Sequence, residues 1–243
     1  MTKFKNWSIS ILLAGAMLFG LQSYSSTASL KFAQVSDAHF YTGANNTTYK
    51  MVGESPKLLD DVIEQINETP NVSFVMFTGD QIDKPFEKEL SAFLPHTEKL
   101  NVPWYFAFGN HDTMYGGYLT PRVYMDLVNN YNKNYKFEKS YYSFVPQKGY
   151  KAIVLDSIIR DRLTANGKLG DEQLQWLDNE LANSKKDTVL IFMHVPILEP
   201  FNSPNHRLLD ADKAEEILNK YNNPIAVFQG HYHGAKITKK DNI

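Results

Sequence analysis

Apolar and polar positions along the chain follow two alternating periods. Short runs that alternate or are continuously apolar, as strands are, occupy residues 30–35, 72–77, 102–108, 189–193 and 225–228. Apolar residues repeat at helical spacing in residues 55–66, 85–94, 120–128, 171–181 and 210–218. Residues 141–145 and 150–155, joined by Pro146-Gln147-Lys148-Gly149, predict an antiparallel hairpin. This alternation predicts an α/β fold with a largely parallel sheet.

Several polar residues mark the expected starts of these helices. Ser55, Thr120, Asp171 and Asp210 each stand where an N-cap is expected, because their side-chain oxygens can accept from free backbone amides. Pro56 follows at a first helical position, where its missing N–H does no harm.

Five polar signatures follow the predicted strands. They are Asp37-Ala38-His39, Gly79-Asp80, Gly109-Asn110-His111-Asp112, His194 and Gly230-His231-Tyr232-His233. In open α/β sheets, ligands bind beyond the carboxyl ends of the strands, so we expect these side chains to meet.

Each signature alone has an ordinary structural explanation. Gly79-Asp80 is common in turns, Asn110 is a typical turn residue, and His194 suits a satisfied histidine in the core. Two imidazoles two residues apart, His231 and His233, favour a metal more strongly. Because every one of these strand ends carries a nitrogen or oxygen ligand, the five signatures together favour one shared metal site.

Composition narrows the possible chemistry. With 243 residues, 43% of them hydrophobic, the chain can bury one sizeable core. The net charge of −2 provides no nucleic-acid-binding signature. Since there is no cysteine, disulfides and thiolate zinc sites are excluded, and metal ligands must be His, Asp, Glu or Asn.

The sequence of residues 1–28 predicts a signal peptide. Lys3 and Lys5 precede an apolar run at residues 9–21, and Ser26-Thr27-Ala28 supplies small residues for cleavage. That run has 13 residues, whereas a membrane span needs about 20. We therefore expect an exported protein (periplasmic, extracellular or cell-surface) with one domain at residues 29–243, and membrane attachment only if the signal stays uncleaved.

Taken together and in this order, the five signatures resemble those of the calcineurin-like metallophosphoesterases, over residues 31–234. The resemblance implies a four-layer α-β-β-α sandwich with two mixed sheets and a metal site at the carboxyl ends of the strands. The chain stops ten residues after His233, so we expect the C-terminal strands to be short or missing. Gly167-Lys168-Leu169, followed by Gln173, Trp176 and Leu177, is similar to the bacterial cyclic-nucleotide phosphodiesterase-like branch.

The resemblance also assigns ligands for two divalent or trivalent metal ions. It implies a first metal held by Asp37, His39 and His233, and a second held by Asn110, His194 and His231. Asp80 would bridge the two ions. Mixed imidazole and oxygen ligands suit Mn, Fe or Zn and leave the metal open.

His111 and Asp112 are the predicted catalytic residues. The resemblance implies that His111 is not a ligand and protonates the leaving oxygen. We expect Asp112 to accept a hydrogen bond from its other ring nitrogen. Purple acid phosphatases, which are relatives, have a metal-binding tyrosine at the position of Asp83, so that subgroup is disfavoured.

The predicted activity is hydrolysis of small phosphate monoesters or diesters, by in-line attack of a metal-bridging hydroxide. A protein phosphatase, which needs an open groove, and a catalytically silent scaffold remain alternatives. Specificity is expected in residues 41–54, 114–120 and 199–209. Candidate residues there are His206, which could reach the substrate, and an aromatic wall of Tyr41, Tyr115 and Tyr118.

Overall fold

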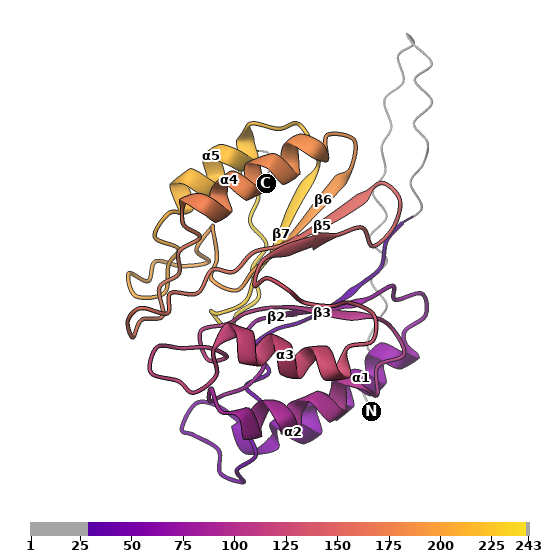
Figure 1. Cartoon of the computed structure of the whole chain (residues 1–243), viewed down its shortest axis with the longest axis vertical. Helices are drawn as coiled ribbons and strands as arrows, with labels where there is room; N and C mark the ends of the chain where they lie inside the picture. The colour runs from indigo at the N-terminus through magenta and orange to yellow at the C-terminus, as the bar shows by residue number, and fades with distance from the viewer. Residues whose placement is uncertain (1–28, 242–243) are drawn as a thin grey trace, which may run out of the picture.

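The computed structural model describes residues 29–241 (Figure 1). The predicted signal peptide at residues 1–28 lies outside this part, so it stays a prediction. Among the described residues, no helix has both the length and the apolar character needed to cross a membrane.

The first sheet contains three parallel strands in the order β1 (Ala33–Val35), β2 (Val75–Thr78) and β3 (Trp104–Ala107). Its outer face is covered by α1 (Ser55–Glu68), α2 (Glu87–Thr97) and α3 (Pro121–Tyr131) (Figure 1). A short 3-10 helix, η1 (Val52–Glu54), leads into α1.

The second sheet is mixed. Its order is β4 (Tyr142–Phe144), β5 (Tyr150–Val154), β6 (Thr188–Phe192) and β7 (Ile225–Phe228), with α4 (Asp171–Asn183) and α5 (Ala211–Asn219) on the outer face (Figure 1). The predicted hairpin is confirmed as the antiparallel pair β4–β5, and the other pairs are parallel. The α-β-β-α sandwich is therefore confirmed. The second sheet is mixed as expected, whereas the strand pairs of the first sheet among the described residues are all parallel. Within the described residues β7 is the last strand and forms an edge.

Aromatic side chains hold the two sheets together. Phe74, next to β2, stacks on Phe32 with ring centroids 5.0 Å apart and meets Phe144 of β4 edge-on at 5.5 Å. Tyr105 of β3 stacks on Phe144 at 3.7 Å. Because such rings bury large apolar areas, this layer fixes one sheet against the other.

The predicted N-cap positions are correct for two of four helices, and the side chain caps the helix at one of these two. The Thr120 hydroxyl accepts from a first-turn amide of α3, as expected. Ser55 and Asp171 are the first residues of α1 and α4, and neither is an N-cap. Asp210 does precede α5, but its carboxylate accepts from two amides next to α4. The Ser55 and Asp210 oxygens accept from loop amides instead, because loop amides compete with helix amides for the same oxygens, whereas Asp171 pairs with Lys213.

Candidate metal centre

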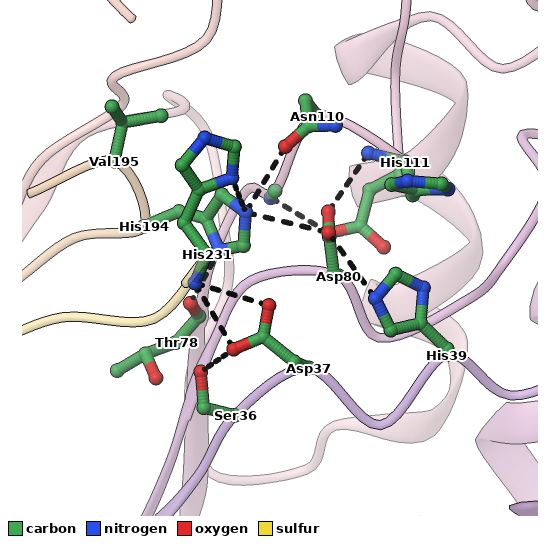
Figure 2. Close-up of polar contacts among 12 residues, drawn as sticks. Ser36, Asp37, His39, Thr78, Asp80, Asn110, His111, His194, Val195 and His231 are labelled. Atoms are coloured by element: carbon green, nitrogen blue, oxygen red, sulfur yellow. Dashed lines mark hydrogen bonds and ion pairs between the residues drawn. The ribbon is translucent and has the colours of Figure 1, made fainter. Parts of the chain in front are cut away.

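The carboxyl ends of five strands meet at one edge of the sandwich and carry all the predicted ligands, of which Figure 2 labels all but His233. Asp37 and His39 follow β1, Asp80 follows β2, Asn110 follows β3, His194 follows β6, and His231 and His233 follow β7. The placement predicted from the strand pattern is therefore correct.

Backbone conformation turns these side chains toward one another. Asp37, His39, Asp80, His231 and His233 all have positive φ angles, between 42° and 76°. Non-glycine residues rarely adopt this conformation, and it concentrates at functional sites. The loop after β3 packs directly against the Asp80 backbone. A Cβ added at Gly109 would lie only 2.0 Å from the Asp80 amide nitrogen. A glycine is therefore required there.

The first group of ligand atoms surrounds His39. Its Nε2 lies 3.1 Å from Nε2 of His233 and 3.6 Å from Oδ2 of Asp80. Nε2 of His233 also lies 3.3 Å from Oδ1 of Asp37. Since all four side chains offer atoms within 4.8 Å of one another, they could hold one metal ion.

The second group surrounds His194. Its Nε2 lies 3.1 Å from Oδ1 of Asn110, 3.2 Å from Nδ1 of His231 and 3.4 Å from Oδ2 of Asp80 (Figure 2). Asp80 thus belongs to both groups, which is the division that the family resemblance implies.

In His194 and His39, the second ring nitrogen faces a hydrogen-bond acceptor. Nδ1 of His194 lies 2.9 Å from the carbonyl of Thr78, and Nδ1 of His39 lies 3.2 Å from Oδ1 of Asp83. Donation from Nδ1 leaves the Nε2 lone pair free for a cation, the usual arrangement of metal-binding histidines. The donor set therefore fits two cations.

The electrostatics of the group favour cations as well. Burial by itself would lower the pKa of His194, but the Asp80 carboxylate outweighs it and raises the pKa to about 9. Burial would raise the pKa of Asp80, yet the surrounding histidines, His194 foremost, hold it below its usual range. Burial and the charge of His194 lower the pKa of His231 to about 3. Because ligation requires neutral imidazole, a metal ion would displace the proton from His194.

The structure corrects the expected partner of His111. Its Nδ1 lies 2.8 Å from the backbone carbonyl of Asp83, and its backbone amide donates to Asp80. Both Asp112 oxygens instead accept from backbone amides, those of Gly109 at 2.8 Å and Ile82 at 3.1 Å. Asp112 is fully buried and braces the loop that carries His111, so its predicted contact with the imidazole is wrong.

Sequence reasoning named Asp83 only as the residue in place of a metal-binding tyrosine and missed its supporting role. Its side chain orients His39 and its carbonyl orients His111, so it supports a candidate ligand and the candidate acid together. Because Asp83 lies three residues after Asp80, the sequence could have indicated that its carboxylate is near the site. The carbonyl contact leaves no mark in a sequence, since every residue has one.

A cavity of about 380 Å³ opens beside the ligands. Asp80, Asn110, His111, His231 and His233 line it, together with Tyr49, Lys50, Ala165, Phe201, Ser203, His206 and Tyr232. His206 thus reaches the cavity, as expected. The aromatic wall is formed by Tyr49, Phe201 and Tyr232 in place of the tyrosines predicted from the sequence.

Comparison with known proteins identifies the family. The profile described as calcineurin-like phosphoesterase matches residues 30–235. The chain belongs to this family. As a calcineurin-like phosphoesterase it is a metal-dependent hydrolase of phosphoric esters, and the His and Asp cluster described above is its candidate metal-binding site.

Individual relatives of this calcineurin-like phosphoesterase are distant. It is 26% identical over 219 residues to a probable glycerophosphodiester phosphodiesterase of Arcobacter nitrofigilis, covering 84% of this chain and 72% of the relative. It is 25% identical over 259 residues to the manganese-dependent ADP-ribose/CDP-alcohol diphosphatase of Arabidopsis thaliana, covering 88% and 80%. A solved dimetal phosphatase from Danio rerio has a TM-score of 0.68 at 18% identity, covering 88% and 85%, which shows a shared fold.

Proposed function

We propose that the chain is a binuclear-metal phosphoesterase that hydrolyses small phosphate monoesters or diesters by in-line displacement. The observation that carries this proposal is the meeting of seven candidate ligands, in two groups that share Asp80, beside His111. A cavity of about 380 Å³ suits a small organic phosphate, which favours this activity over a protein phosphatase. A silent scaffold is disfavoured because every candidate ligand and His111 are present.

Each residue of the site has a proposed role. Asp37, His39 and His233 would hold one ion, Asn110, His194 and His231 would hold the other, and Asp80 would contact both. When bound, the two ions supply positive charge for the phosphoryl oxygens and acidify the attacking water.

His111 serves the leaving group. Hydrolysis forms a bond from phosphorus to the water oxygen and breaks the bond to the leaving oxygen, which must gain a proton. Since the Asp83 carbonyl only accepts, Nδ1 of His111 keeps its own hydrogen, and the proton for the leaving oxygen must come from Nε2 of the imidazolium form. The attacking water releases the proton that restores this form.

The test uses p-nitrophenyl phosphate and its bis ester with the Mn²⁺-supplemented protein. We expect hydrolysis that EDTA abolishes. His111→Ala should reduce turnover by about 10²–10⁴-fold while elemental analysis still finds metal. Asp80→Ala should lose metal.

His96→Ala is the matched control for the histidine substitution, because His96 lies on α2 and contacts Asp60. Its turnover should equal that of the wild type. Hydrolysis of neither ester by the metal-loaded protein would support the scaffold hypothesis, and loss of metal in His111→Ala would refute the role given to His111.

A further inference from the structure

A lysine ammonium lies within the candidate site. Nζ of Lys50 is 3.2 Å from Nδ1 of His39 and 3.4 Å from Oδ1 of Asp83, and Lys50 lines the same cavity as Asp80 and His111. We propose that Lys50 is a specificity-determining residue whose ammonium binds an anionic phosphoryl oxygen and favours phosphate monoesters over diesters. This inference rests on the proposed phosphoesterase function.

The loop that carries Lys50 holds it in place. The Lys50 amide donates to the Thr47 hydroxyl, and the Lys50 carbonyl accepts from the Thr47 amide, each at 2.9 Å. Farther back, the amide and hydroxyl of Thr42 donate to the buried carboxylate of Glu89 at 2.7 and 2.9 Å. The Lys50 side chain is only 13% exposed, unlike a solvated surface lysine. Its position is therefore built into the fold.

The groups around Lys50 form a position for a cation. His39, Asp83 and His111 lie close enough together to hold a metal ion, and the Lys50 ammonium forms an ion pair with the Asp83 carboxylate of this group. An ammonium has three donors. The ion pair with Asp83 uses one donor and anchors the side chain, while others remain available to the cavity that Lys50 lines.

Such a cation discriminates between phosphate esters by charge. A monoester approaches two negative charges near neutral pH, because its second pKa is about 6, whereas a diester carries one. The metal ligands serve either substrate. Esterification of the oxygen next to Lys50 would remove the anionic acceptor of those ammonium donors that face the cavity, which penalises the diester.

The test compares Lys50→Met and Lys50→Arg with the wild type, each as the Mn²⁺-loaded full chain. In Lys50→Met, kcat/KM for p-nitrophenyl phosphate should fall by about 10- to 100-fold, the effect of one charged hydrogen bond. The kcat/KM for the bis ester should change by less than about threefold. Lys50→Arg should recover part of the monoester activity, and the metal content of both variants should equal that of the wild type.

Binding of inorganic phosphate, measured by calorimetry, tests Lys50 independently of turnover and should be weaker in Lys50→Met by a similar factor. Lys57→Met makes the same change on an exposed residue of α1 and should alter neither activity nor binding. An unchanged ratio of the two kcat/KM values, unchanged phosphate binding, or loss of metal in Lys50→Met would each overturn the inference. Absence of hydrolysis of both esters by the loaded wild type would overturn the proposed function instead, and phosphate binding would still decide the role of Lys50.

Discussion

His111 and Asp112 are neighbours in the chain whose side chains serve different purposes. Burial lowers the pKa of His111, which lines the cavity, while burial and the charge of Asp80 raise the pKa of Asp112, which lies beneath the loop. Family resemblance located both residues and could not reveal their partners. A buried carboxylate that accepts from two backbone amides stabilises a loop, because each amide would otherwise lack an acceptor.

Asp112→Asn should therefore destabilise the protein more than it affects chemistry. An asparagine oxygen can accept from only one of the two amides, and the side-chain NH₂ would face the other. We expect the free energy of unfolding of the metal-free protein to fall by about 1–3 kcal/mol, measured by urea denaturation. Asp126→Asn makes the same change at an exposed position of α3 and should leave it nearly unchanged. If Asp112→Asn reduced turnover without altering stability, the result would instead support a role of Asp112 in orienting His111.

At the scale of elements, the helices on the first sheet are joined by a small charge cluster. Oδ1 of Asp60, on α1, lies 2.6 Å from Nδ1 of His96 on α2 and 2.6 Å from Nζ of Lys99 just beyond α2. Burial would raise the pKa of Asp60, but hydrogen bonds from Lys99 and His96 outweigh it and lower the pKa below 3.8. His96 is thus a structural residue.

The lowered pKa of Asp60 predicts a pH-dependent contribution to stability. A carboxyl with a lower pKa in the folded state stabilises the fold above its unfolded pKa of 3.8, and this stabilisation is lost as the pH falls through the folded pKa. Asp60→Asn should lower the free energy of unfolding at pH 6 by at most about 1 kcal/mol, because the pair is partly exposed. The difference from wild type should shrink at pH 3, as measured by urea denaturation.

Asp61→Asn on the same helix is the matched control, since Asp61 is exposed, and it should show a smaller difference at pH 6. An equal loss of stability at pH 3 and pH 6 for Asp60→Asn would exclude the ion cluster as its cause.

Elements were predictable from the sequence where a local pattern determines them. Strand β2 was expected at residues 72–77 and is observed at Val75–Thr78, because pairing with its neighbours sets its ends. The hairpin and the capped start of α3 depend on adjacent residues and were predicted correctly. Lys50 could not be placed, because its position depends on a loop anchored by Glu89, which lies 39 residues further along the chain.

At the scale of the whole molecule, the candidate metal centre joins the two sheets. Asp37, His39, Asp80 and Asn110 come from the first sheet, whereas His194, His231 and His233 come from the second. Without metal, contacts such as Asp80 with His194 and the His231 amide with Asp37 cross between the sheets. Two cations would add bonds to both sides and stabilise the folded state, because the unfolded chain holds no such site.

Removal of metal should therefore lower the thermal stability of the whole protein. At a free metal concentration one hundred times the Kd, one site contributes about 2.7 kcal/mol. For a chain of this size each kcal/mol shifts Tm by about 2–4 °C, so EDTA should lower Tm by about 5–10 °C for each site. Calorimetry of the Mn²⁺-loaded and EDTA-treated protein measures this shift. Asp80→Asn, which weakens both sites, should melt near the EDTA-treated wild type and respond little to EDTA. A Tm that stays constant while elemental analysis shows complete metal removal would mean that the direct contacts already hold the sheets in place and that the cations add nothing to the fold.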